Sequence, residues 1–208
     1  MAARDRLAEY HRRRDFAKTT EPEGATGTQS AERSSYVVQI HEATALHFDF
    51  RLEVDGVLKS WAVPKGPSTD PHDKRLAMPT EDHPLEYRDF ECVIAGGEHG
   101  AGVVIVWDEG TYRNLSTDRV GREIPLAQAL ADGHASFRLD GHKLHGGWSL
   151  TRFRKGTGKE REAWLLVKHA DRRASARGTP DPRRARSART GHILRQAAGE
   201  GEGEGVSP

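Results

Sequence analysis

Hydrophobic and polar residues alternate with a period of two over residues 46–54, which read LHFDFRLEV. Because successive side chains of a β-strand point to opposite faces, this pattern predicts a strand with one apolar and one polar face. The residues of the polar face are His47, Asp49, Arg51 and Glu53. The next two residues, Asp55 and Gly56, are typical of a two-residue type I′ turn. We therefore expect residues 46–54 to open a β-hairpin.

A two-residue turn would fix the register of this hairpin against residues 57–63. The paired residues would be Val54–Val57 and Phe50–Trp61 on the apolar face, and Arg51–Ser60 and Asp49–Ala62 on the polar face. An aromatic cross-strand pair stabilises the apolar side. The small partners on the polar side leave open volume beside the charged groups. A strand whose polar face was simply exposed to solvent would not need small residues opposite its charged ones.

Further short runs of β-branched and aromatic residues are separated mostly by Gly, Pro, Asn or Asp, which is typical of strands and turns. The runs are 36–41, 57–63, 74–80, 102–108, 135–139, 148–153 and 163–169. Helical patterns are short and occur near Leu7 to Arg14 and at Pro125 to Gly133, the latter with proline early and glycine at its end. About eight strands with few helices predict a mainly β domain, either a barrel or a sandwich.

Composition divides the chain into three regions, 1–35, 36–170 and 171–208. The first is a polar arm, and the second holds every tryptophan. The third contains eight arginines and ends in GEGEGEGVSP, so we expect it to be a disordered tail. Lys plus Arg number 32 against 31 for Asp plus Glu, a balance that neither demands nor excludes a polyanionic partner. With one cysteine and no apolar leader, the chain is expected to be cytoplasmic and nucleoid-associated, without a membrane partner.

A metal site is the first hypothesis for the polar face. His41 ends the run 36–41, and a loop of Glu42 to Ala45 would fold it back beside His47 and Asp49. Two imidazoles and one carboxylate without a thiolate suit Mn²⁺, Fe²⁺ or Zn²⁺. From the residues alone, three alternatives stay open: a solvated sheet face, a non-haem Fe(II) oxygenase and a non-catalytic nucleic-acid-binding barrel.

Longer motifs narrow these alternatives. The stretch VVQIHEATALHFDFRLEVDGVLKSWAVPKGPSTDP is followed by KRLAMPTEDHPLEY. The flanking motifs are RRRDFAKTTEPEG upstream and GAGVVIVWDEGTY and WLLVKH downstream. In this order they resemble the 3′-phosphoesterase domain of bacterial DNA ligase D, over most of residues 7–170.

The resemblance implies a compact β-barrel and a manganese-dependent hydrolase of phosphate esters that acts on DNA or DNA–RNA primer–template 3′ ends. Such an enzyme removes a terminal ribonucleoside and then the 3′-phosphate, leaving a hydroxyl for break repair. The metal ligands it implies are His41, His47 and Asp49. The residues implied to contact the scissile phosphate are Arg51, His83 and Tyr87. Further catalytic or substrate-binding positions are Arg14, Asp15, Glu21, Gln39, Lys65, Arg75 and Glu81.

One loop departs from the family pattern. The chain reads IAGGEHGAG, so Ala95, Gly96 and His99 replace a proline, an acidic residue and an aromatic residue. The sequence also contains no Lys-x-Asp-Gly motif of a nucleotidyltransferase, so it is not expected to seal a nick itself. We expect a free-standing, monomeric enzyme that works with a separate DNA ligase or end-binding repair factor.

Overall fold

The computed structural model describes residues 6–24, 34–157 and 160–201. The strands in these residues are β1 Ser35–Glu42, β2 Leu46–Val54, β3 Val57–Val63, β4 Arg75–Pro79, β5 Cys92–Ile94, β6 Gly102–Asn114, β7 His134–Gly141, β8 His145–Arg154 and β9 Ala163–Lys168. The helices are α2 Ala8–Arg12, the 3₁₀ helix η1 Leu85–Asp89, α3 Leu126–Asp132 and α4 Leu194–Gly201. Both helices expected from the sequence are present as α2 and α3.

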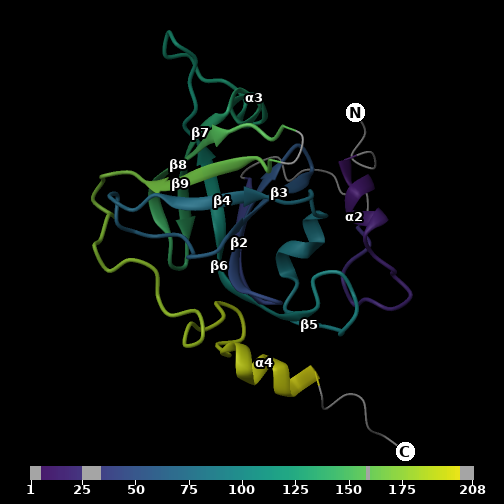
Figure 1. The fold of residues 1–208 in the computed structure, drawn as a ribbon. Coiled ribbons are helices and arrows are strands. Elements are labelled where there is room, and N and C mark those ends of the chain that lie inside the picture. Colours follow the sequence, from purple (N-terminus) through teal and green to yellow (C-terminus); the bar gives the residue numbers. More distant parts are fainter. Residues whose placement is uncertain (1–5, 25–33, 158–159, 202–208) are drawn as a thin grey trace, which may run out of the picture.

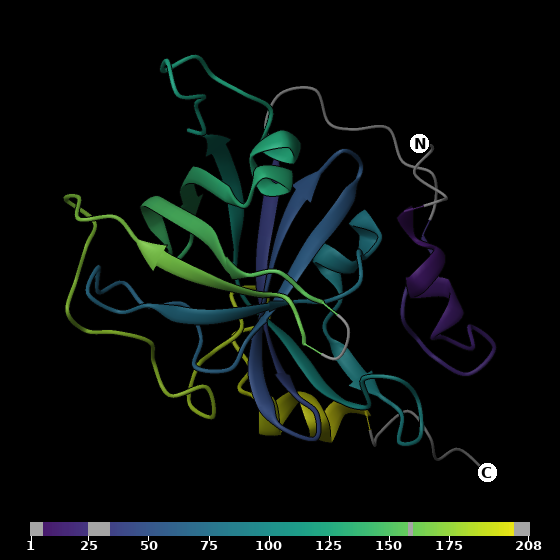
Figure 2. The ribbon, with the colours of Figure 1, turned by 45° about the horizontal axis from the view of Figure 1, so that its top comes forward.

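Eight of the strands close into an antiparallel β-barrel. They follow the order β1-β2-β3-β4-β9-β8-β7-β6, and β6 pairs in turn with β1 (Figure 1, Figure 2). The short strand β5, which the sequence did not predict, adds to β6 outside this circuit. The prediction of a compact, mainly β barrel is therefore confirmed, and the eight runs read from the sequence are its eight strands.

The hairpin of β2 and β3 has the predicted register. Val54 pairs with Val57, and the turn residues Asp55 and Gly56 have φ angles of 50° and 82°. Phe50 pairs with Trp61, and the ring of Phe50 stacks on Phe137 from the far wall with the centroids 5.9 Å apart. The apolar face of β2 thus fills the barrel interior, as the alternation of residues requires.

The opposite face of β2 lies on the outer wall of the barrel, beneath a second layer of structure. A smaller hydrophobic cluster joins Leu7 and Tyr10 of the arm to Tyr87 of η1 and Leu58 of β3. As a result Asp49 and Arg51 are buried, with exposed fractions of 5% and 2%. This covering layer explains why a strand in a barrel wall carries so many polar groups.

The C-terminal segment follows the barrel as far as the structure describes it. Ala185 and Leu194 are buried in the main hydrophobic cluster, and α4 contacts β5 and β6 below the barrel (Figure 1). We expected almost nothing to be buried after Asp171, and these two residues differ from that expectation. Isolated apolar residues in an arginine-rich stretch have no period that marks them as buried. Residues 202–208 of the expected tail, and residues 1–5 and 25–33 of the expected arm, lie outside the described residues.

Replacing Leu194 with alanine should lower the free energy of unfolding by about 2–4 kcal/mol, because the leucine is only 2% exposed. Urea denaturation measures the change. Arg195→Ala, at an exposed position of the same helix, should shift stability by less than about 0.5 kcal/mol. Equal stability of the leucine variant and the unchanged chain would mean that this segment does not pack on the barrel in solution.

None of the helices within the described ranges combines the length and apolar character needed to cross a bilayer.

Candidate active site

Three candidate metal ligands meet where β1 and β2 approach their connecting loop. His41 of β1 is paired directly with His47 of β2, and Asp49 lies two residues further along the same face. One ligand atom from each of the three lies within 4.8 Å of the others. The two imidazole rings have centroids 5.0 Å apart. The strand pairing itself therefore brings the predicted triad together.

Backbone carbonyls orient both imidazoles. The Nε2 of His41 lies 2.7 Å from the carbonyl oxygen of Gly100, and the Nδ1 of His47 lies 2.7 Å from that of Ala45. Since a carbonyl oxygen only accepts, we assign the ring proton to these nitrogens. The lone pairs of the other nitrogens, His41 Nδ1 and His47 Nε2, then remain for a cation, and each lies 3.7 Å from an oxygen of Asp49. This donor set fits a divalent transition-metal ion.

Asp49 keeps its negative charge despite burial. Burial alone would raise the pKa of its carboxyl group, but the positive charge of the neighbouring Arg51 holds that pKa well below the usual range. The Nη2 of Arg51 donates to Asp49 Oδ2 at 3.0 Å. The carboxylate is thus ionised and oriented before any cation arrives.

Arg51 connects the metal ligands to the rest of the site. Besides Asp49, its Nε donates to Gln39 Oε1 at 2.8 Å and its Nη1 donates to Ser60 Oγ at 2.8 Å. The same Nη1 lies 2.9 Å from the Nδ1 of His83. The planar guanidinium makes all of these contacts at once, which an ammonium group cannot do. Within the described residues, one hydrogen of Nη2 stays free for a ligand.

His83 lies between two guanidinium groups. Burial lowers the pKa of its imidazole well below the ordinary value, and the positive charges of Arg51 and Arg14 lower it further. The Nη2 of Arg14 lies 3.4 Å from the Nε2 of His83. At neutral pH this imidazole is therefore uncharged, and it is a poor proton donor there.

The arm supplies the outer wall through Arg14. Its guanidinium forms ion pairs with Glu21 at 2.9 Å and Glu81 at 3.1 Å, and it stacks over the ring of Tyr10 at 3.7 Å. The hydroxyl of Tyr87 donates to Glu21 Oε1 at 2.9 Å. Burial raises the pKa of that hydroxyl well above its ordinary value, so Tyr87 keeps its proton.

These groups enclose a cavity of about 170 Å³. The predicted residues that line it are Arg14, Glu21, His41, His47, Asp49, Arg51, Glu81, His83 and Tyr87. The sequence did not point to five further lining residues, which are Ala43, Thr80, Ile94, His99 and Gly100. Of these, His99 was identified from the sequence only as a departure from the family pattern. Its Nε2 lies 3.5 Å from Glu81 Oε1. The cavity thus combines a candidate cation site with two arginines, a set of groups that suits an anionic ligand.

Comparison with known proteins agrees with this chemistry. The model of the DNA ligase D 3′-phosphoesterase domain matches residues 39–152, which is more than half of the chain. The chain belongs to this family. That family match contains all three candidate metal ligands.

Several bacterial relatives of this phosphoesterase family are much longer. The multifunctional non-homologous end joining protein LigD of Pseudomonas aeruginosa is 52% identical over 166 residues, which cover 79% of this chain and 19% of the relative. LigD of Mycobacterium tuberculosis is 52% identical over 108 residues, covering 52% of this chain and 14% of the relative. LigD of Mycolicibacterium smegmatis is 40% identical over 146 residues, which cover 70% of this chain and 19% of the relative. The chain therefore spans less than a fifth of the length of these relatives.

Four of the positions that the family resemblance implied lie outside the cavity lining. Asp15 is exposed and pairs with Lys18 at 3.1 Å, and Lys65 is also exposed. Arg75 pairs with Asp73 at 2.8 Å. For these three residues, a catalytic or substrate-binding role remains a prediction.

The fourth position, Gln39, is fully buried and braces the site from beneath. Its amide nitrogen donates to the carbonyl oxygens of Tyr87 and Phe90, while its oxygen accepts from Arg51. The register of β1 against β6 shifts between Val38 and Gln39, and such a bulge changes the direction of a side chain. Gln39 thus ties η1 to Arg51 and has no accessible surface for a substrate.

The stability of this phosphoesterase domain should fall as the pH drops below about 6.5, the ordinary pKa of histidine. The folded state holds His83 neutral to a lower pH than the unfolded state does, so the unfolded state binds more protons in this window. Urea denaturation in EDTA at a series of pH values measures the slope. His83→Gln should flatten it, whereas His72→Gln, at a side chain that is 93% exposed, should not. The same slope in all three proteins would contradict this assignment.

Proposed function

We propose that this chain is a metal-dependent DNA 3′-end-healing phosphoesterase. It would remove a 3′-terminal ribonucleoside by phosphodiester cleavage and then remove the remaining 3′-phosphate, leaving a 3′-hydroxyl for break repair. The observation that carries the proposal is the His41, His47 and Asp49 triad, whose free lone pairs converge beside two arginines in one cavity. Membership of the 3′-phosphoesterase family supports the reaction class.

The three ligands would hold a divalent cation, which we propose to be Mn²⁺. When bound, such an ion supplies a Lewis acid that polarises a phosphate oxygen and a water molecule. Arg51 keeps Asp49 ionised and offers its remaining Nη2 hydrogen to a phosphate oxygen. Arg14 adds a second positive charge, which would stabilise the negative charge that spreads over the phosphoryl oxygens during transfer.

His83 and Tyr87 are better suited to positioning than to proton donation. The imidazole of His83 is neutral and contacts both Arg14 and Arg51, so it fixes the two guanidinium groups relative to each other. The proton of Tyr87 points to Glu21, and the ring of Tyr87 lies 4.8 Å from the Arg51 guanidinium. Both side chains would therefore orient the arginines that contact the phosphate.

The relatives suggest the setting. They are named as multifunctional non-homologous end joining proteins and carry the matched region within a much longer chain. We propose by analogy that this domain prepares DNA 3′ ends for a DNA ligase and that an end-binding repair factor cooperates with it.

A 5′-labelled primer annealed to a template and ending in one ribonucleotide tests the function. With Mn²⁺, the primer should become one nucleotide shorter, first with a 3′-phosphate and then with a 3′-hydroxyl, and EDTA should prevent both products. Running the reaction without oxygen or an oxoacid separates it from oxygenase chemistry. An unchanged primer at every Mn²⁺ concentration would reject the proposal.

A further inference from the structure

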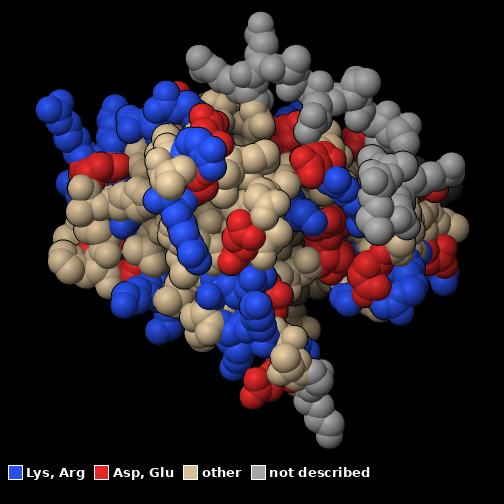
Figure 3. Space-filling model, turned by 90° about the horizontal axis from the view of Figure 1, so that it is seen from above, with Lys and Arg blue, Asp and Glu red and all other residues tan. Residues whose placement is uncertain are grey.

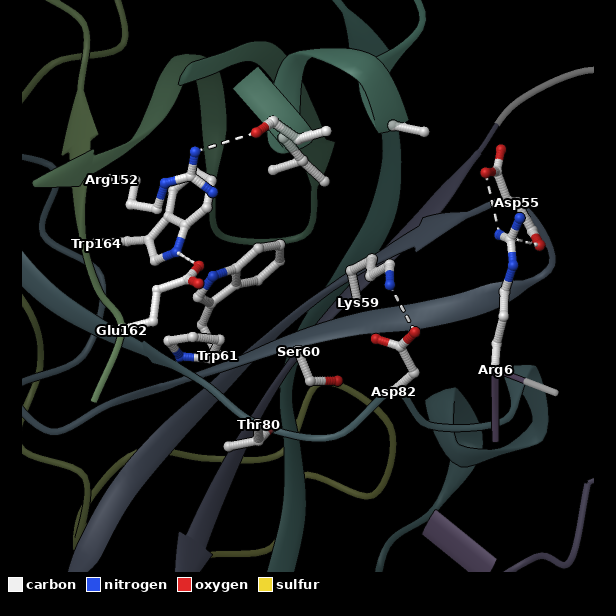
Figure 4. Close-up of a pocket in the computed structure, with 14 residues that line it drawn as sticks. Arg6, Asp55, Lys59, Ser60, Trp61, Thr80, Asp82, Arg152, Glu162 and Trp164 are labelled. Carbon is white, nitrogen blue, oxygen red and sulfur yellow. Dashed lines mark hydrogen bonds and ion pairs between the residues drawn. The ribbon is translucent and has the colours of Figure 1, made fainter. Parts of the chain in front are cut away.

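A second cavity, of about 460 Å³, opens at the α3 end of the barrel. Figure 4 shows its wall, in which two tryptophans and an arginine lie at one side and two ion pairs lie at the other. We call it the tryptophan cavity and define it by Trp61, Trp164, Arg152, Glu162, Ser60 and Thr80. Its volume falls in the range of pockets that bind small organic groups.

The aromatic wall is already fixed in position. The rings of Trp61 and Trp164 pack edge to face with centroids 6.1 Å apart. The Nε1 of Trp164 donates to Glu162, and the guanidinium of Arg152 lies 5.4 Å from the Trp164 ring while it donates to the carbonyl oxygen of Ala131. Because Trp61 and Trp164 are only 4% and 3% exposed, the partly exposed guanidinium of Arg152 offers the main plane for a nucleobase to stack on, with the indoles as its backing.

One polar group in this wall has no partner. Trp61 is only 4% exposed, and its indole nitrogen is buried. This nitrogen finds no hydrogen-bond acceptor in the part of the chain that the structure describes. A buried donor without an acceptor costs free energy. An acceptor on a bound molecule, such as a base carbonyl or ring nitrogen, would relieve that cost after a small adjustment of the wall.

The charges of the tryptophan cavity favour a neutral occupant. The charged residues that line it are Arg6, Lys59 and Arg152 with Asp55, Asp82 and Glu162. Lys59 pairs with Asp82 at 2.6 Å, and Arg6 pairs with Asp55 at 3.0 Å. Figure 3, seen from the α3 end, shows basic and acidic side chains interspersed on this face. A phosphate would find no excess of positive charge here, whereas an uncharged heteroaromatic ring fits.

The tryptophan cavity adjoins the candidate active site. Thr80 lines both cavities. Ser60 lines the tryptophan cavity, and its hydroxyl oxygen accepts a hydrogen bond from Arg51. A group in this cavity therefore lies about one side chain away from the groups that surround the phosphate. That distance suits two parts of a single nucleotide.

We propose that the tryptophan cavity binds the base of the nucleotide whose 3′-oxygen carries the reacting phosphoryl group. This nucleotide is present in both proposed steps, since it holds first the diester and then the 3′-phosphate. The inference rests on the proposed function for the position of the phosphate. At a frayed DNA end, a base leaves the stack at a small energetic cost.

Binding without metal tests the cavity separately from catalysis. Two 5′-fluorescein oligonucleotides ending in a 3′-phosphate are compared by fluorescence anisotropy in EDTA, one with a normal terminal nucleotide and one with an abasic residue there. The normal end should bind about 10-fold more tightly, the effect of stacking one base. Ala131→Phe, which adds bulk to the cavity wall on α3, should remove this preference. Gln128→Phe, at an exposed position of the same helix that does not line the cavity, should keep it.

Trp61→Phe keeps an aromatic ring in the core and removes only the unpaired donor, so it should reduce the preference by a few-fold without unfolding the protein. Equal binding of the two ends by the unchanged chain, or an equal loss in the Ala131 and Gln128 variants, would overturn the inference.

Adding Mn²⁺ separates the two proposals. Removal of the phosphate from both ends without a binding preference rejects only the base site. A preference without any phosphate removal supports the base site and rejects the proposed reaction.

Discussion

Replacing Asp49 with asparagine is expected to reduce 3′-end processing by about three orders of magnitude. Asparagine has the shape of aspartate but not its charge, so the triad would lose its one anionic ligand and hold a divalent cation weakly. A metal ion contributes several kcal/mol to stabilising transition-state charge, and about 1.4 kcal/mol corresponds to a tenfold change in rate. Turnover of the ribonucleotide-ended primer and Mn²⁺ binding by calorimetry should both fall. DNA binding in EDTA should change little.

Asp140→Asn is the matched control. Asp140 also lies beside a histidine, with its Oδ1 3.6 Å from the Nδ1 of His145, but its side chain is 75% exposed and it does not line the active-site cavity. This variant should process primers like the unchanged chain. If Asp49→Asn retained full activity at limiting Mn²⁺, the triad could not be the metal site. If the unchanged chain bound DNA but processed none, a non-catalytic binding barrel would explain the data better.

Replacing Arg51 with lysine should both destabilise the protein and reduce activity by at least about 100-fold. Lysine offers one nitrogen in place of three, so the contacts to Gln39, Ser60, His83 and Asp49 cannot all be kept. Each buried acceptor left without a donor costs about 1–3 kcal/mol, so we expect a loss of about 2–4 kcal/mol in the free energy of unfolding. Urea denaturation and primer turnover well below the melting temperature measure the two effects separately.

Arg122→Lys provides the comparison for this substitution. Arg122 forms an ion pair with Asp118 at 2.8 Å, but its side chain is 80% exposed, so the exchange should alter stability by less than about 0.5 kcal/mol. Unchanged stability and activity in the Arg51 variant would show that its hydrogen bonds are not required. Lost activity with unchanged stability would place its main role at the phosphate.

Local patterns were sufficient to predict the hairpin that carries the site. Two-residue periodicity assigned the faces of residues 46–54, and Asp55 with Gly56 set a register that the structure confirms as far as Asp49 opposite Ala62. The same reasoning placed His41 beside His47. Both results depend on residues that are close in sequence, where turn chemistry and alternation act directly.

Contacts between distant segments could not be read in this way. Arg14 meets Glu81 across 67 positions of sequence, and nothing in the basic run around Arg14 indicates that partner. The closure of the barrel by β1 and β6 is likewise a long-range pairing that the strand patterns leave open between a barrel and a sandwich. The burial of the polar face of β2 depends on these long-range contacts. The sequence therefore identified the candidate functional side chains but not how deeply they are buried.

The double pairing of β1, with β2 along one edge and β6 along the other, has a consequence for how the proposed metal site would be filled. His41 sits on an interior strand, and its partner ligands sit on the neighbouring strand β2, itself bonded on both sides. An ion bound there as proposed would enter and leave without rearrangement of the scaffold, and different divalent ions would meet the same geometry. The ion that occupies the proposed site in a cell should accordingly depend on the supply of each ion and on its coordination chemistry, and not on the folding of the chain.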